Sequence, residues 1–236
     1  MPNLLRKIVR LFVYWYYWVI DYTYVGFWQV LGFFRRTDTH TFLQNSWSPD
    51  KKQILLLPGV YERWEFMKPI ARSLLDAGYS VHVVEGLGYN TSSVEEAAEV
   101  VDRYVRDNDL KNCAIVAHSK GGLIGKYVLS FSEQKERYVG MVALNTPFGG
   151  SVYAYLLPFR HLRIFTPRSS LLRLLAQEEG VNTRIYSIYG TFDPHIPGGS
   201  HLTGAHNIQL KTYGHFRVIQ DRKTQTELLG ALKKLF

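Results

Sequence analysis

The residue types that could carry covalent chemistry lie in three short segments of the sequence. The first segment, Cys113–Gly125, begins as an apolar run typical of a buried parallel strand and turns abruptly at Ser119. Small residues surround the turn at Ala117, Gly121 and Gly122, where a strained backbone leaves little room for side chains. A serine on such a strand-to-helix turn presents its hydroxyl above the sheet edge. The pattern is typical of a serine nucleophile, although a serine that caps an ordinary helix has a similar pattern.

The other two segments supply an acid and a base. A nucleophilic serine needs a base that accepts its proton and an acid that orients the base. Asp193 follows a predicted strand at 184–189, and His215 follows the last predicted strand at 206–210. Because the carboxyl ends of parallel strands meet at one edge of a sheet, we expect both side chains to lie near Ser119. Where a serine lies on a strand-to-helix turn of an α/β sheet, the chain order serine, aspartate, histidine is typical. This order predicts a triad of Ser119, Asp193 and His215.

Acyl transfer also needs backbone N–H donors for the oxyanion of its transition state. We predict two donors, the N–H of Lys120 directly after the serine and the N–H of Val60 directly after Pro58-Gly59. We also expect the Lys120 side chain to place a positive charge at the rim of the site, which would favour anionic acyl substrates.

Other histidines compete with His215 for the role of base; they are His118, His195, His201 and His206. A strand residue beside the serine turn is expected to point away from the serine, which disfavours His118. His195 and His201 lie in the aspartate loop, ahead of the last strand, and they rank second. No HExxH or CxxC spacing occurs, so we expect no metal ion and no cofactor.

Composition is consistent with one globular domain. The chain has 236 residues, of which 46% are hydrophobic and 20% are charged, and this is sufficient for a single core. The formal net charge is +8, but no nucleic-acid motif is present, so we expect no nucleic-acid partner; the charge also suits an anionic membrane surface. Cys113 is the single cysteine, so no disulfide within the chain is possible and cysteine does not indicate the compartment.

Strands and helices alternate along the chain from residue 53, which predicts an α/β fold with a doubly wound, mostly parallel sheet. The remaining elements are predicted as strands at 53–57, 80–85 and 138–144 and a last helix at 224–236. Residues 152–180 form an irregular stretch that mixes apolar residues with arginines. We interpret this stretch as a lid or acyl-binding cap, and the alternative is a surface insertion that packs on the sheet.

Residues 1–36 differ in composition from everything that follows. An apolar run rich in Tyr and Trp extends from Leu11 to Phe34, with Asp21 as its only charged residue and basic residues at both flanks. The run is long enough to span a bilayer. A plain spanning helix is disfavoured because an acidic side chain is costly at the bilayer centre and because Tyr and Trp favour the interfaces.

Helical spacing places a weakly polar stripe along one face of this segment, consisting of Tyr14, Tyr17, Asp21 and Tyr24. Such a face suits a helix that lies in the membrane surface or packs on protein. We therefore divide the chain into a membrane-associating segment, residues 1–36, and a catalytic domain, residues 37–236. The alternative is a cytoplasmic protein in which the segment covers the domain's own core or an oligomer interface.

From about Gln53 to the C-terminus the chain resembles the small bacterial triacylglycerol lipases and esterases of the α/β-hydrolase fold. The resemblance rests on residues 57–60, 115–122, 145–151 and 187–193, and on 201–210 together with 214–216. The chain departs from many relatives at Pro58, where they have histidine, and at Lys120, where they have methionine or glutamine. Residues 1–36 are outside the resemblance.

The resemblance and the predicted triad together imply hydrolysis of lipid or acyl esters through an acyl-enzyme. The composition of residues 1–36 predicts that this reaction takes place at a membrane surface. An acyltransferase or a thioesterase would use the same triad with a different acceptor or leaving group. A membrane-bound scaffold with a vestigial triad is a further alternative, and the presence of all three residues argues against it. The sequence leaves acyl-chain length, headgroup, orientation and oligomeric state open.

Overall fold

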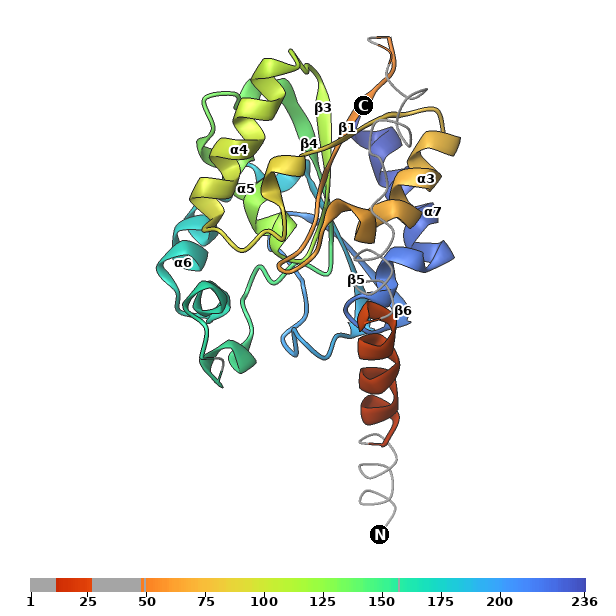
Figure 1. The fold of residues 1–236 in the computed structure, drawn as a ribbon, viewed down its shortest axis with the longest axis vertical. Coiled ribbons are helices and arrows are strands. Elements are labelled where there is room, and N and C mark those ends of the chain that lie inside the picture. Colours follow the sequence, from red (N-terminus) through yellow and green to blue (C-terminus); the bar gives the residue numbers. More distant parts are fainter. Residues whose placement is uncertain (1–11, 27–47, 49, 157) are drawn as a thin grey trace.

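At the centre of the molecule is a six-stranded sheet, which the computed structural model shows with helices on both faces (Figure 1). The structure describes residues 12–26, 48, 50–156 and 158–236. The strands lie in the order β2-β1-β3-β4-β5-β6, and each neighbouring pair is parallel. They are β1 (Gln53–Leu57), β2 (Ser80–Val83), β3 (Cys113–His118), β4 (Tyr138–Leu144), β5 (Ile185–Phe192) and β6 (His206–Tyr213). The prediction of a mostly parallel sheet flanked by helices is confirmed.

Helices cover the sheet in two layers (Figure 1). One layer holds α4 (Val94–Asp107), α5 (Lys120–Phe131) and α6 (Ser170–Gln177), and the other holds α3 (Lys68–Asp76) and α7 (Arg222–Leu235). Short 3-10 helices occupy the connections: η1 (Trp64–Met67), η2 (Glu85–Leu87), η3 (Lys135–Arg137), η4 (Val152–Leu156), η5 (Arg160–Phe165), η6 (Asn182–Arg184) and η7 (Arg217–Gln220). Each layer covers its own core: Ile115 of β3 faces the first layer and its neighbour Val116 faces the second, as the alternation of a strand requires.

Local sequence signals set where the helices begin. Ser93 precedes α4; its hydroxyl oxygen accepts from the Glu96 N–H, and the Glu96 carboxylate accepts from the Ser93 N–H. This capping box satisfies two N–H groups that have no partner within the helix. Asp221 caps α7 by accepting from the Thr224 N–H at 3.0 Å.

The strand order brings the loops that carry the predicted site residues to one edge of the sheet, which we call the functional edge. β1 and β3 are neighbours although the chain passes through β2 between them, so the loops that leave their carboxyl ends diverge and open a crevice. Gly59 and Val60 follow β1, and Ser119 follows β3. Asp193 follows β5 and His215 follows β6, so all these residues lie on the same edge.

A helix over residues 12–26 packs beside the carboxyl ends of β5 and β6 (Figure 1). Its ring contacts are Tyr14 stacked on Phe192, Tyr17 stacked on Tyr213 and Tyr24 against Phe66. Asp21 is fully buried on the same face. The predicted stripe is therefore the face that contacts the domain, and the rest of segment 1–36 lies outside the described residues. Among the helices that the structure describes, none is long and apolar enough to cross a membrane.

Residues 152–180 form η4, η5 and α6 on one flank of the functional edge. Ala154, Leu162 and Phe165 are buried in the core on the α5 side of the sheet. Tyr155 and Leu156 are exposed. The segment therefore packs on the domain through one side and leaves apolar side chains in solvent on the other.

Gly121 lies where α5 crosses the end of β1. A Cβ there would overlap the backbone carbonyl oxygen of Leu57, which cannot move without moving the strand. We expect Gly121→Ala to lower the free energy of unfolding by about 1–3 kcal/mol, the usual cost of overpacking. Thermal unfolding measures the change. The control is Gly230→Ala in α7, where a Cβ meets nothing within 4 Å and alanine should raise stability by about 0.5–1 kcal/mol. An unchanged melting temperature for Gly121→Ala would contradict this account.

Candidate active site

Ser119 lies on a strained turn between β3 and α5. Its backbone has φ 50° and ψ −118°, a conformation that L-residues rarely adopt. The turn is held by the Ser119 N–H, which donates to the Leu144 carbonyl oxygen at 2.9 Å, and by the Gly122 N–H, which donates to the Ser119 carbonyl oxygen at 3.0 Å. A Cβ at Gly122 would overlap the Thr146 side chain, so this position requires glycine. The turn directs the serine hydroxyl towards His215.

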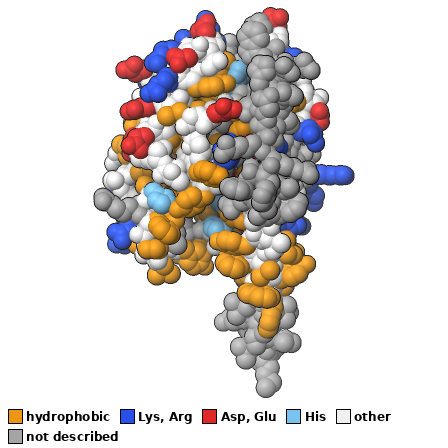
Figure 2. Space-filling model, in the orientation of Figure 1, with side chains coloured by type: hydrophobic (Ala, Val, Ile, Leu, Met, Phe, Trp, Pro, Cys, Tyr) orange, Lys and Arg blue, Asp and Glu red, His pale blue; other side chains and the backbone are white. Residues whose placement is uncertain are grey.

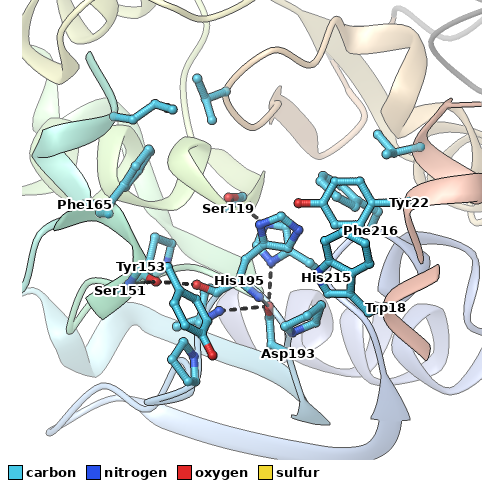
Figure 3. Close-up of a pocket in the computed structure, with 18 of the residues that line it drawn as sticks. Trp18, Tyr22, Ser119, Ser151, Tyr153, Phe165, Asp193, His195, His215 and Phe216 are labelled. Atoms are coloured by element: carbon cyan, nitrogen blue, oxygen red, sulfur yellow. Dashed lines mark hydrogen bonds and ion pairs between the residues drawn. The ribbon is translucent and has the colours of Figure 1, made fainter. Parts of the chain in front are cut away.

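The three predicted triad residues meet in one row of hydrogen bonds (Figure 3). Ser119 Oγ donates to His215 Nε2 at 2.9 Å, and His215 Nδ1 donates to Asp193 Oδ2 at 2.6 Å. The other carboxylate oxygen, Asp193 Oδ1, accepts from the N–H groups of His195 at 2.7 Å and Ile196 at 3.1 Å. All three triad side chains belong to buried residues. This arrangement allows the imidazole to take the serine proton while the carboxylate fixes its tautomer.

Burial and attraction act in opposite directions on the His215–Asp193 pair. Burial by itself lowers the pKa of His215, but the negative charge of Asp193 and its hydrogen bond outweigh burial and raise the pKa above the ordinary value. For Asp193, burial acts to raise the pKa, and the positive charge and hydrogen bond of His215 outweigh it and lower the pKa. The pair therefore favours an imidazolium beside a carboxylate.

The backbone of His215 is held from two sides. Its N–H donates to Asp21 Oδ2 at 2.7 Å. Its carbonyl oxygen accepts from Asn145 Nδ2 at 3.1 Å and lies 3.0 Å from His118 Nε2. The position of this loop histidine thus depends on side chains from the N-terminal helix, from the residue after β4 and from the end of β3.

A buried glutamate shapes the loop that is predicted to supply an oxyanion donor. Glu62 Oε2 accepts from the Gly59 N–H at 2.7 Å and lies 2.8 Å from His118 Nδ1. A Cβ at Gly59 would meet the Glu62 carboxyl at 2.9 Å, so a side chain there would have to displace this carboxylate. Val60 comes next in the chain and lines the cleft. The carboxylate therefore ties the turn before Val60 to the histidine that contacts the His215 backbone.

The Lys120 side chain does not reach the rim of the site, so that expectation is wrong. The residue is 1% exposed, and its Nζ donates to the carbonyl oxygens of Asn90 at 2.7 Å and Ser92 at 2.5 Å. The first turn of α5 directs this side chain towards the loop that precedes α4, away from Ser119. Burial lowers the pKa of its ammonium group to about 8. The backbone N–H of Lys120 is in the first turn of the helix, where it has no acceptor within the helix.

The competing histidines take other positions. His118 points towards Glu62 and not towards the serine. His195 has its ring centroid 4.8 Å from that of His215, but burial lowers its pKa to about 3, which makes it a weak base. His201 and His206 are exposed. Within the described residues, no group of three or more His, Cys, Asp or Glu side chains is placed to hold a metal ion.

A cleft of about 1090 Å³ opens above the three residues (Figure 3). Helix 12–26 supplies one wall, with Tyr14, Trp15, Trp18 and Tyr22. The segment 152–180 supplies the opposite wall, with Tyr153, Ala154, Leu162 and Phe165. Apolar and aromatic side chains thus enclose Ser119, His215 and Asp193.

Solved structures share this architecture. A lipase of Bacillus licheniformis in its mature form matches with a TM-score of 0.65 and 14% identity, over 78% of this chain and 93% of the lipase. The chain has the α/β-hydrolase fold. A carboxylesterase structure from Nitrososphaera gargenis matches with a TM-score of 0.57 and 14% identity, over 80% of this chain and 92% of that one. A bacterial membrane phospholipase A matches with a TM-score of 0.56 and 13% identity, over 80% of each chain. No protein-family model and no curated protein sequence matches the chain.

In this α/β-hydrolase domain the three residues predicted as a triad come together, and the supporting residues are those that sequence reasoning missed. Asp21 carried a signal, since it is the lone charge of an apolar helix, but its partner lies 194 residues away. Asn145 directly follows β4 at the functional edge of the sheet. Glu62 lies three residues after Gly59, and nothing in the local pattern marks it.

The buried position of the Lys120 side chain can be tested by substitution. We expect Lys120→Met to deprive the carbonyl oxygens of Asn90 and Ser92, of which the first contact is buried and the second partly buried, of their donor. The free energy of unfolding should fall by about 1–3 kcal/mol. The pKa of Lys120 is about 8 in the folded protein and 10.5 for the free group, so between these values the unfolded chain binds more protons. The stability of the wild type relative to the variant should therefore rise as the pH increases from about 8 towards 10.5. Denaturant unfolding at several pH values measures both effects.

The control for this test is Lys111→Met, because Lys111 is exposed and its ion pair with Asp109 lies in solvent. It should change stability little at any of these pH values. The contacts of Lys120 with Asn90 and Ser92 would be contradicted if Lys120→Met were as stable as the wild type at every pH tested.

Proposed function

We propose that this protein is a serine hydrolase that cleaves carboxylic esters of lipids or other acyl compounds through an acyl-enzyme intermediate. The observation that carries the proposal is the row of hydrogen bonds from Ser119 through His215 to Asp193 at the floor of an apolar cleft. The lipase, carboxylesterase and phospholipase with the same fold support an ester substrate.

The reaction follows from the roles of the three side chains. Ser119 Oγ attacks the ester carbonyl carbon while His215 Nε2 takes the hydroxyl proton, and Asp193 stabilises the imidazolium. The negative charge that develops on the carbonyl oxygen is stabilised by the N–H groups of Val60 and Lys120. The ester C–O bond then breaks, and His215 gives its proton to the departing alcohol. Water, activated by His215, attacks the acyl-enzyme and releases the carboxylic acid and free Ser119.

The two walls of the cleft suit the acyl part of a substrate. Trp18 and Tyr22 on one side and Tyr153 and Phe165 on the other leave an apolar channel that leads to the serine (Figure 3). Residues 152–180 act in this proposal as an acyl-binding cap. Tyr61 directly follows Val60, the proposed oxyanion donor. Its hydroxyl is hydrogen-bonded to His161 of the cap and so connects the cap to the loop that follows β1.

Ser119→Ala should fold normally and lose at least about 10³-fold in kcat, with the residual rate supplied by the oxyanion donors. Hydrolysis of p-nitrophenyl esters measures the loss, and a fluorophosphonate probe should label the wild type and not the variant. His215→Ala should be at least as damaging. Because attack needs a neutral imidazole and the pKa of His215 lies above 6.5, kcat/KM should rise with pH through that raised pKa.

Two variants serve as controls for these substitutions. Ser92→Ala removes an exposed hydroxyl and should leave labelling and turnover unchanged. His195→Ala removes the neighbouring ring and should keep far more activity than His215→Ala. Full activity in Ser119→Ala would disprove the proposed nucleophile, and full activity in His215→Ala with loss in His195→Ala would reassign the base. Product analysis with ester, thioester and alcohol acceptors separates hydrolysis from acyl transfer.

We further propose that the mouth of the cleft docks on a lipid surface through segment 1–36 and the cap, which together present the catalytic domain 37–236 to its substrate. The outward face of helix 12–26 is apolar: Phe12 is 69% exposed and Trp15 is 65% exposed. On the cap, Leu156 is 81% exposed, and Tyr155 and Phe159, within three residues of it, are also exposed. Figure 2 shows hydrophobic side chains gathered on both projections at the same end of the molecule. Exposed apolar patches of this kind mark binding surfaces.

Phe12→Glu combined with Leu156→Glu tests this surface, because neither residue lines the cleft. We expect co-sedimentation with anionic phospholipid vesicles to weaken at least about tenfold, since each side chain contributes on the order of 1.5–3 kcal/mol when buried. Turnover of a soluble ester should persist. The matched control is Phe131→Glu at the far end of α5, which should sediment as the wild type does. Wild-type protein that stays in the supernatant would contradict the docking.

A further inference from the structure

Asp21 is the one acidic residue of helix 12–26, and it is buried against the histidine loop. Its Oδ2 accepts from the His215 N–H at 2.7 Å, and its Oδ1 accepts from the N–H groups of Phe216 at 3.0 Å and Arg217 at 3.1 Å. Among the described residues no lysine or arginine forms an ion pair with it. A carboxylate removed from water is tolerated only where other donors replace its hydration, and here three backbone N–H groups do so.

The residue before the histidine is fitted to this contact. Gly214 has φ +110°, and a Cβ there would meet Asp21 Oδ1 at 2.6 Å. The Gly214 N–H donates to the Phe192 carbonyl oxygen at 2.9 Å, and its own carbonyl oxygen accepts from Asn145 Nδ2 at 3.0 Å. The backbone from residue 214 to residue 217 therefore wraps closely around one carboxylate.

We propose that Asp21 is a positioning residue for His215, so that the N-terminal helix is part of the catalytic apparatus. This inference rests on the proposed serine hydrolase function. Asp21 fixes the N–H of His215, and Asn145 fixes its carbonyl oxygen. With both backbone groups held, the ring points its Nε2 at Ser119 Oγ. Without the carboxylate, three consecutive N–H groups would turn to find other acceptors and carry the imidazole with them.

The carboxylate also acts on the imidazole through its charge. The charged and titratable groups that face His215 are Asp21, Asp193, Glu62, His118 and His195. Asp193 is the largest of the acidic contributions that raise the pKa of His215, and Asp21 adds to it. Burial raises the pKa of Asp21 itself, while the donated N–H groups and the charge of His215 act in the opposite direction.

Asp21→Asn in the full-length protein tests the inference. The amide keeps the shape of the side chain but loses the charge, and one of its two terminal atoms no longer accepts from an N–H. We expect kcat on a soluble p-nitrophenyl ester to fall by about 10- to 100-fold with KM unchanged, as a small misplacement of the base requires. The acid limb of the kcat/KM profile should move to lower pH, because a negative charge beside the imidazole is lost.

The matched control is Asp221→Asn, an aspartate that also accepts a backbone N–H but at the start of α7. It should lower the melting temperature without changing the pH profile. Asp21→Asn with wild-type kcat and an unmoved acid limb would overturn the inference, and so would a loss that only follows the folded fraction. A wild-type protein that is inactive and unlabelled at Ser119 would instead disprove the proposed function.

Asp21→Ser provides a second variant if the asparagine protein does not fold, since serine keeps one acceptor and lacks the charge. It should show the same fall in kcat and the same shift of the acid limb. If neither variant folds, amide hydrogen exchange of the wild type decides. Slow exchange of the His215, Phe216 and Arg217 amides, lost when the pH is lowered enough to protonate Asp21, supports the inference. Exchange at the rate of unstructured chain overturns it.

Discussion

The position of one imidazole ring is the constraint on which the rest of the functional edge depends. His215 must meet its partners from a loop, and a loop has few contacts of its own with which to fix a side chain. The chain solves this by holding both backbone polar groups of the residue, the N–H through Asp21 and the carbonyl oxygen through Asn145 and His118. If helix 12–26 left the domain, the Asp21 carboxylate and the three backbone N–H groups that it accepts from would lose their hydrogen-bond partners. The docking of this helix and the position of the His215 ring therefore depend on each other.

The sheet was predictable because buried parallel strands are short apolar runs bounded by turn residues. β1 and β4 have the predicted bounds, Gln53–Leu57 and Tyr138–Leu144. β5 and β6 continue three residues beyond the predicted strands, to Phe192 and Tyr213. These last residues pair with each other at the border of the sheet, where one face meets solvent and helix 12–26, so their mixed composition hid them from a search for apolar runs.

The meeting of Ser119, Asp193 and His215 was predictable for a different reason, since triad residues of this fold keep a fixed chain order and each follows a strand. The residues that support the triad, such as Asp21, Asn145 and Glu62, follow no fixed order or spacing. The spacing of Tyr14, Tyr17, Asp21 and Tyr24 showed that they share a face, but not that the face meets the domain while the apolar side stays exposed. Adjacency to the serine suggested a rim position for Lys120, whereas the first turn of α5 directs that side chain into the neighbouring loop. Sequence spacing gives the direction of a side chain relative to its own element, and contacts between distant elements decide what it meets.

Within the described part of the chain, no lysine or arginine forms an ion pair with Asp21 or Asp193. Asp21 accepts from backbone N–H groups, and Asp193 accepts from backbone N–H groups and from the imidazole itself. A lysine or arginine partner would cancel much of the negative charge, whereas N–H dipoles hold the carboxylate in place and leave its field acting on the ring. In the proposed reaction the imidazolium forms when the serine proton is taken, and its charge then meets groups that are already oriented towards it. The contacts that fix the histidine in one position therefore also stabilise the charge that it acquires.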